Sequence, residues 1–205
     1  MKNTTKLFLA LTALISFAFV KPKFIEPKQI NVVIDASHGG YDSGAKVGGF
    51  TEKQIVEQIT HKIYALNKNK NVVIHLTRSS DTFVSLVERT NTINALKPDL
   101  VLSLHVNSNS NKNKSGMEMY VANENKSSEM SLAFAGKLYD KFINNNLKVN
   151  EIKNAKFYIL KKSEVPAVLV ELGYLSNESD SKYLTDEKEQ NRLAETIIDF
   201  ISELK

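Results

Sequence analysis

Short β-branched runs alternate with segments of helical periodicity in the first half of the chain, and this alternation constrains the fold most. The strand-like runs are Asn31 to Ala36, Asn71 to Thr77 and Leu100 to Leu104. Apolar residues recur at helical spacing after Thr51 and again from Leu86 to Leu96. A βαβαβ order predicts an α/β fold with a mostly parallel sheet, helices on both faces, and ligands beyond the carboxyl ends of the strands.

The second half of the chain continues this pattern, and its 205 residues fit a single domain. Met117 to Val121 is a predicted strand and Ser128 to Phe142 a predicted helix. Phe157 to Leu160 and Ala167 to Glu171 are further short apolar runs, and Glu187 to Leu204 is a predicted amphipathic helix that closes the fold. No internal repeat or low-complexity tract interrupts this order.

The N-terminus has the pattern of a secretory signal peptide. Lys2 and Lys6 precede an uncharged apolar run, Leu7 to Val20, which is shorter than the ~20 residues that a helix needs to span a bilayer. Cleavage after Ala18 is expected, although an uncleaved anchor, with transient membrane contact, is an open alternative. We expect an exported protein, periplasmic or secreted to the cell wall. The predicted organisation is a signal peptide or anchor at 1–18, a linker at 19–29 and a single folded domain at 30–205 that would carry any function.

Composition restricts the chemistry of any functional site. The chain has no cysteine, so a metal site has to be built from histidine, carboxylate or main-chain ligands. The net charge of +4 and the pI near 9.0 suit an anionic cell-wall or membrane surface. The basic residues are scattered, with no basic run interleaved with aromatics, so nucleic-acid binding is not expected.

Four residues suited to metal chemistry follow or begin predicted elements at one end of the sheet: His38, Glu52, His105 and Glu171. Two histidines and one carboxylate form a familiar zinc set for amide hydrolysis, with a further position left for water. Glu171 follows a dry apolar strand, where ordinary surface charge is not expected. Taken singly, His38 could be a loop residue, His105 a core histidine, and Glu52 a carboxylate favoured by the helix dipole.

Four segments in order resemble the motifs of one family, the zinc-dependent N-acetylmuramoyl-L-alanine amidases of the amidase 3 type. They are Asp35 to Gly40, Gly49 to Lys53, Leu102 to Asn107 and Val170 to Asn177. The resemblance runs from about Asn31 to Lys205. The chain departs from the family at Ala36-Ser37, where Pro-Gly is usual, and at Val106, where alanine is usual; neither change removes a candidate ligand.

The resemblance implies a zinc enzyme with a mixed sheet of about six strands. His38, Glu52 and His105 would hold one zinc ion per chain, and Glu171 would be the catalytic carboxylate. The implied substrate is peptidoglycan, cut at the amide bond between N-acetylmuramic acid and L-alanine to release stem peptides. A catalytically weak peptidoglycan-binding module and a zinc peptidase acting on the stem peptide are the alternatives. The sequence identifies no activator protein.

The remaining polar residues near these motifs receive structural interpretations. His61 lies in the middle of a predicted helix and His75 in the middle of a predicted strand, so neither is expected at the carboxyl edge. Arg78, Asp81 and Arg89 are expected to fix the loops rather than to contact substrate.

Overall fold

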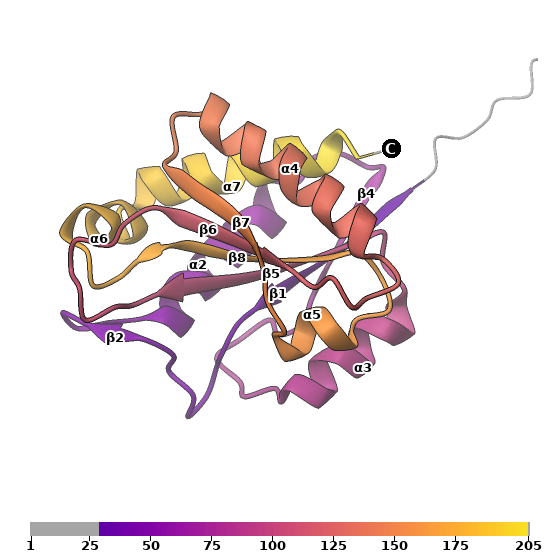
Figure 1. Cartoon of the computed structure of the whole chain (residues 1–205), viewed down its shortest axis with the longest axis horizontal. Helices are drawn as coiled ribbons and strands as arrows, with labels where there is room; N and C mark the ends of the chain where they lie inside the picture. Colours follow the sequence, from indigo (N-terminus) through magenta and orange to yellow (C-terminus); the bar gives the residue numbers. More distant parts are fainter. Residues whose placement is uncertain (1–28, 205) are drawn as a thin grey trace, which may run out of the picture.

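The computed structural model describes residues 29–204, and the predicted signal peptide or anchor lies outside them. The chain folds around a six-stranded sheet in the order β4-β1-β5-β8-β6-β7 (Figure 1). All neighbouring pairs are parallel except β6 and β8, which are antiparallel. The predicted α/β class, with a mostly parallel sheet of six strands, is therefore confirmed. The strands are β1 Ile30–Ala36, β4 Val72–Leu76, β5 Leu100–Asn107, β6 Met117–Val121, β7 Val149–Asn154 and β8 Ala167–Tyr174.

A separate two-stranded antiparallel ribbon, β2 Lys46–Val47 and β3 Phe50–Thr51, precedes the first helix. The helices are α2 Glu52–Leu66, α3 Leu86–Leu96, α4 Ser128–Asn144, α5 Tyr158–Lys162, α6 Glu178–Thr185 and α7 Glu187–Ser202. No helix among the residues described is long and apolar enough to cross a membrane.

Helices cover both faces of the sheet because the central strands are apolar on both sides. Along β1, Ile34 belongs to a large core formed with α2, α4 and α7, whereas Val33 belongs to a smaller core formed with α3 and α5. Successive side chains of a strand point to opposite faces, so one apolar run supplies both cores. Figure 1 shows α3 and α5 together on one side of the sheet and α4 and α7 on the other.

The start of α3 is fixed by a capping box between Ser85 and Glu88. The Ser85 hydroxyl accepts a hydrogen bond from the Glu88 amide at 3.2 Å, and the Glu88 carboxylate accepts one from the Ser85 amide at 2.9 Å. These bonds satisfy two backbone donors that the first helical turn leaves unpaired. In the same turn, Arg89 pairs with Asp35 of β1 at 2.7 Å, which holds the start of α3 beside the carboxyl end of that strand.

Some local predictions differ from the structure. A threonine directly before a helix commonly caps it, but the hydroxyl of Thr51, the residue before α2, donates to the Gln54 side chain and does not cap the helix. The sequence places Glu171 at the end of one strand and ends another strand just before His105. In the structure, Glu171 lies inside β8, which continues to Tyr174, and His105 lies inside β5, which continues to Asn107. The strands run on because β5 and β8 pair with each other beyond the site, which satisfies their backbone groups.

Candidate metal centre

Three of the predicted site residues converge at the carboxyl edge of the sheet. His38 follows β1, Glu52 is the first residue of α2, and His105 lies on β5. Glu52 Oε1 lies 3.0 Å from His38 Nε2 and 3.0 Å from His105 Nδ1. One ligand atom from each residue lies within 4.8 Å of the others. We call these three residues the triad.

The triad depends on a tight turn that leaves no room for a side chain at Gly44. His38 has a φ of +58°, an unusual conformation for a residue other than glycine. Gly44 lies so close to the triad that a Cβ there would be 2.3 Å from Glu52 Oε2. The Glu52 carboxylate also accepts hydrogen bonds from the amides of Ala45 and Val106, at 2.9 and 3.0 Å. Backbone donors therefore fix this carboxylate from two directions.

Asp42 orients the first histidine, a role that the sequence interpretation did not assign. Its Oδ2 lies 2.8 Å from His38 Nδ1, so the other ring nitrogen, Nε2, is directed at Glu52. A carboxylate behind a metal-binding histidine is a common arrangement that fixes the tautomer and the ring orientation. The spacing of four residues within a glycine-rich loop is the signal in the sequence that could have indicated it.

Electrostatics keep the Glu52 carboxylate anionic. Burial alone would raise the pKa of Glu52, but hydrogen bonds and charge from His105 and His38 outweigh it and lower the pKa. Burial would also lower the pKa of His38, yet Glu52 and Asp42 raise that pKa to about 9. Without a metal, the raised pKa of His38 leaves a proton beside this carboxylate. A divalent cation would displace it, and the converging nitrogen and oxygen donors fit zinc.

Glu171 lies beside the triad on the next strand, directly opposite His105 in the pairing of β5 with β8. Its Oε2 is buried without a hydrogen-bond partner among the residues described. Burial is the largest cause of a pKa raised to about 7, and the charges of Glu52 and Glu118 act in the same direction. A buried, unpaired carboxyl oxygen next to a candidate metal site is poised to exchange a proton with a bound reactant.

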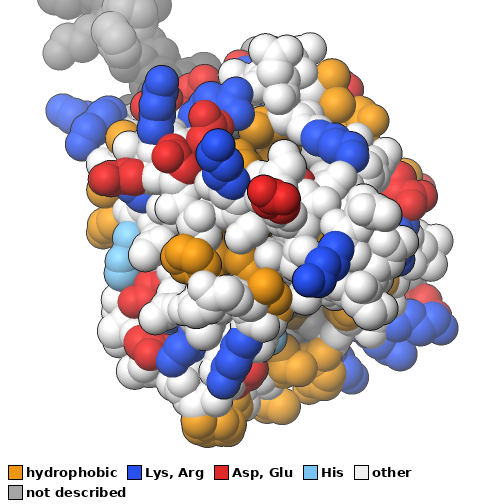
Figure 2. All heavy atoms as spheres, turned by 90° about the vertical axis from the view of Figure 1, so that its left-hand side faces the viewer, with side chains coloured by type: hydrophobic (Ala, Val, Ile, Leu, Met, Phe, Trp, Pro, Cys, Tyr) orange, Lys and Arg blue, Asp and Glu red, His pale blue; other side chains and the backbone are white. Residues whose placement is uncertain are grey.

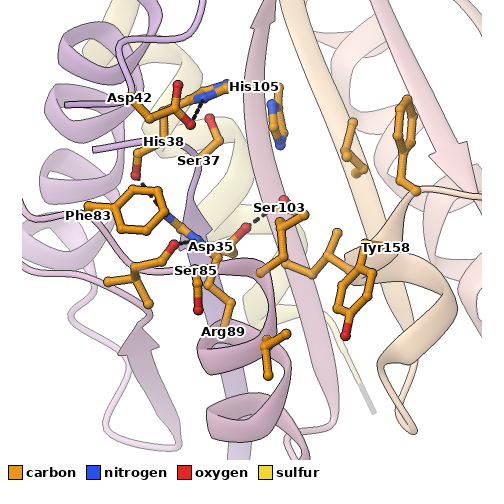
Figure 3. A pocket seen from close by; sticks show the side chains of 16 residues that line it. Asp35, Ser37, His38, Asp42, Phe83, Ser85, Arg89, Ser103, His105 and Tyr158 are labelled. Atoms are coloured by element: carbon orange, nitrogen blue, oxygen red, sulfur yellow. Dashed lines mark hydrogen bonds and ion pairs between the residues drawn. The ribbon is translucent and has the colours of Figure 1, made fainter. Parts of the chain in front are cut away.

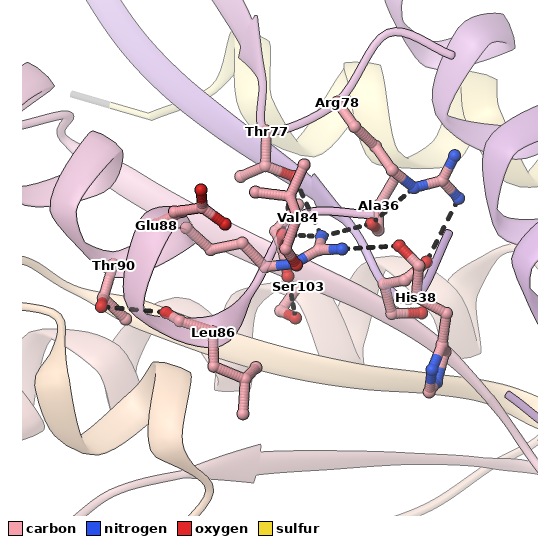
Figure 4. Close-up of polar contacts among 12 residues, drawn as sticks. Ala36, His38, Thr77, Arg78, Val84, Leu86, Glu88, Thr90 and Ser103 are labelled. Carbon is pink, nitrogen blue, oxygen red and sulfur yellow. Dashed lines mark hydrogen bonds and ion pairs between the residues drawn. The ribbon is translucent and has the colours of Figure 1, made fainter. Parts of the chain in front are cut away.

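Two buried arginines hold the turn that carries His38 (Figure 4). Arg89 of α3 pairs with Asp35 at 2.7 Å and donates to the carbonyls of Ala36 and His38, each at 2.5 Å. Arg78 donates to the Ala36 carbonyl at 3.1 Å and also contacts the carboxylate of α2 residue Glu57 at 2.6 Å. These contacts agree with the structural roles predicted for both arginines.

The other predicted structural residues lie outside the triad. Asp81 accepts hydrogen bonds from the Gly40 amide at 2.8 Å and from Lys53 Nζ at 2.6 Å. His61 Nε2 faces the Ser79 carbonyl at 3.2 Å, and His75 Nε2 lies 3.3 Å from an asparagine side chain at the start of β1. Neither histidine belongs to the candidate metal cluster found among the described residues.

A cavity of about 640 Å³ opens beside the triad, on the face of the sheet that α3 and α5 cover (Figure 3). His38 and His105 lie at one end of it, and the buried pair Asp35 and Ser103 lies behind. Figure 2 looks onto the end of the molecule where β8 leads into α6. Charged side chains of both signs are scattered over that face, and hydrophobic ones gather in its lower half. An α/β sheet with such a triad beside a cavity has the arrangement expected of a metal-dependent hydrolase.

Comparisons with known proteins agree with this arrangement. The family model of Amidase_3, N-acetylmuramoyl-L-alanine amidase, matches residues 32–203. The chain therefore belongs to the N-acetylmuramoyl-L-alanine amidase family, whose members are hydrolases of cell-wall peptidoglycan. The resemblance inferred from the four motifs is confirmed at the level of the family.

Individual relatives give the extent of the similarity. The chain is 33% identical over 171 residues to the uncharacterized protein YqiI of Bacillus subtilis, covering 83% of this chain and 82% of that protein. It is 32% identical to the N-acetylmuramoyl-L-alanine amidase LytC of Bacillus subtilis, covering 82% of this chain but only 34% of LytC. The catalytic domain of CwlV, an N-acetylmuramoyl-L-alanine amidase from Bacillus (Paenibacillus) polymyxa, superposes with a TM-score of 0.78. The two sequences are 35% identical over an alignment that covers 85% of this chain and 97% of that domain.

Proposed function

We propose that this protein is a zinc-dependent amidase that hydrolyses the bond between the lactyl group of N-acetylmuramic acid and L-alanine, releasing stem peptides from peptidoglycan. The observation that carries the proposal is the convergence of His38, Glu52 and His105 beside an open cavity, with the unpaired carboxyl oxygen of Glu171 next to them. Membership of the amidase family supplies the substrate class.

His38, Glu52 and His105 would hold one zinc ion per chain. When bound, zinc supplies a Lewis acid that polarises the scissile carbonyl and makes water a nucleophile near neutral pH. Asp42 keeps the His38 ring nitrogen turned toward the centre. The amides that donate to Glu52 restrain its carboxylate, so little reorganisation is needed when the cation binds.

Glu171 is the proposed general base and acid. Its buried carboxylate would take a proton from the attacking water and deliver it to the amine of L-alanine as the amide bond breaks. This role needs a group that is dry, unpaired and beside the reacting atoms. Glu171 meets these conditions because its Oε2 has no partner in the described part of the chain and its strand pairs with that of His105.

Export to the cell wall is part of the proposal, because the substrate lies outside the cytoplasm. The charged and then apolar N-terminus supports it. The product would be a soluble stem peptide and a glycan strand that keeps its N-acetylmuramic acid.

Glu171→Gln tests the mechanism, with Glu203→Gln as the matched control. Glu203 is an exposed residue that pairs with Lys141 and lies outside the cavity. We expect Glu171→Gln to bind zinc in a one-to-one ratio but to release peptide from purified peptidoglycan about 10² to 10⁴ times more slowly. Glu203→Gln should keep the wild-type rate until a chelator removes the metal. Wild-type rates from folded, zinc-loaded Glu171→Gln would refute the assigned role.

A further inference from the structure

The cavity beside the triad is bordered by an unusual concentration of exposed apolar side chains. Phe83 lies in the loop before α3, Leu86 and Val87 lie in the first turn of α3, and Phe157 and Tyr158 lie at the start of α5. All five of these large hydrophobic side chains are exposed to solvent, although they line the same cavity. Exposed apolar groups that gather around a hollow mark a binding surface, whereas single ones do not.

Aromatic rings stand on opposite sides of this cavity. Figure 3 shows Phe83 on one side and Tyr158 on the other, with His38 and His105 at the upper end. Tyr41 stacks on Phe83 at 4.3 Å between ring centroids, which extends that wall. The Phe83 wall also lies close to the triad. Gly40, two residues after His38, packs so tightly against this wall that a Cβ at Gly40 would lie only 2.8 Å from the Phe83 amide nitrogen.

The floor of the cavity offers no free charge. Asp35 is paired with Arg89 at 2.7 Å and accepts hydrogen bonds from the hydroxyls of Ser103 and Thr77, both at 2.7 Å. Arg89 uses its remaining donors on main-chain carbonyls. The cavity therefore suits an uncharged ligand with apolar faces better than a charged one.

The surface beyond Glu171 has the opposite character. There β7 carries Lys153, whose ammonium nitrogen lies 2.9 Å from carboxylate oxygens of both Glu118 of β6 and Glu151 of β7. Tyr120 donates its hydroxyl to the other Glu118 oxygen at 2.7 Å. Because Glu118 is opposite Glu171 in the pairing of β6 with β8, this charged group is continuous with the site.

We propose that the cavity binds the glycan side of the substrate, with sugar rings between the Phe83 and Tyr158 walls, while the stem peptide extends over β6 and β7. This inference rests on the proposed function. The scissile amide joins an uncharged sugar, with apolar ring faces and N-acetyl methyl groups, to a polar, charged peptide. The apolar cavity and the charged strands both adjoin the triad, and they meet where Phe157 of the cavity wall packs on Tyr120 of β6, at 5.2 Å between ring centroids. Each half of the substrate therefore meets the surface that matches it. This match fixes the direction in which the substrate lies.

The double variant Phe83→Ala/Leu86→Ala tests the orientation against the control Tyr64→Ala/Leu132→Ala. The control variant also removes one exposed aromatic side chain and one exposed leucine side chain, but neither Tyr64 nor Leu132 lines the cavity. The two leucines are matched, because Leu86 and Leu132 are both 53% exposed. Two substrates with the same scissile amide are compared: a disaccharide-tetrapeptide and a lactoyl-tetrapeptide that lacks the sugars. Bound zinc is measured for each protein.

We expect wild-type protein to prefer the disaccharide substrate at least tenfold in kcat/KM. The cavity variant should lose most of that preference through a higher KM for the disaccharide substrate, with its zinc content and its rate on the lactoyl peptide unchanged. The control variant should behave as wild type. Equal losses on both substrates, or an unchanged preference, would overturn the inference alone and assign the apolar surface to another occupant, such as a protein or a membrane. Cleavage of neither substrate by zinc-loaded wild-type protein would overturn the proposed function and the inference with it.

Discussion

Removing the guanidinium of Arg89 should destabilise the fold more than any exposed charge change. Arg89→Met leaves Asp35, which is 2% exposed, with only the hydroxyls of Thr77 and Ser103 as partners. Breaking one side of a buried ion pair costs about 3 to 5 kcal/mol because the other charge stays buried. For a domain of this size, that loss corresponds to a fall in Tm of roughly 6 to 20 °C.

The loss should also depend on pH. In the wild-type protein, burial would raise the pKa of Asp35, but Arg89 and the hydroxyl hydrogen bonds outweigh it and lower the pKa. The stability from this lowered pKa is present above the unfolded pKa of about 4 and is lost as the pH falls through the folded value. Without Arg89, burial raises the pKa of Asp35, so the variant loses stability as the pH rises. The difference between the two proteins should therefore be larger at pH 7 than near pH 3, where only the loss of the Arg89 hydrogen bonds to main-chain carbonyls remains.

Urea unfolding of the metal-free proteins measures this difference, with Arg192→Met as the control. Arg192 is a partly exposed residue of α7 that pairs with Glu189 and donates to the Asn145 carbonyl at 3.2 Å, and its removal leaves no fully buried charge, so the expected loss is only about 1 kcal/mol. The double variant Asp35→Asn/Arg89→Met should recover part of the loss, since it no longer buries an unpaired charge. A loss for Arg89→Met no larger than that for Arg192→Met would refute the reasoning.

Three further predictions concern the triad and the neighbouring Glu171. Gly44→Ala should weaken zinc binding, because a Cβ at Gly44 would lie 2.3 Å from the triad carboxylate. Gly48 is the control: it has the same φ of +60° but open space around it, so Gly48→Ala should bind zinc as wild type. Competition with a chelator measures both affinities. Asp42→Asn should reduce zinc affinity about 10- to 100-fold by weakening the contact that orients His38, and unchanged affinity would exclude that role. In the metal-free protein, the pKa of Glu171 is raised to about 7, so stability should fall as the pH rises from about 4.5 through 7. Metal-free Glu171→Gln should then be more stable than wild type at pH 8 and similar near pH 4 in urea unfolding, and parallel pH profiles would contradict this.

The central sheet was predictable because its strands are apolar on both faces. Val33 and Ile34 face different cores, so the run that contains them reads as a continuous apolar segment. Strand β7, Val149–Asn154, was not predicted, because it lies at the edge of the sheet and has only one fully buried residue among mostly polar ones. Helix α6, Glu178–Thr185, was missed for a similar reason, since it has a single buried residue, Leu184.

The candidate ligands were predictable individually, but their supporting contacts were not. His38 and His105 follow or end apolar runs, which place them at the same edge of a parallel sheet. The pairing of Arg89 with Asp35 joins residues 54 positions apart, and neither its burial nor its geometry is visible in a periodic pattern. The same holds for the cavity, because its lining comes from five segments that are separated in the chain.

Mass analysis of the peptides released from purified peptidoglycan by zinc-loaded protein tests the central claim most directly. The account predicts stem peptides that begin with a free L-alanine amine, a glycan that keeps N-acetylmuramic acid with a free lactyl carboxylate, and no release once a chelator is added. Peptides cut between two amino acids would contradict the amidase assignment in favour of a peptidase. No release from folded, zinc-loaded protein would favour a peptidoglycan-binding module.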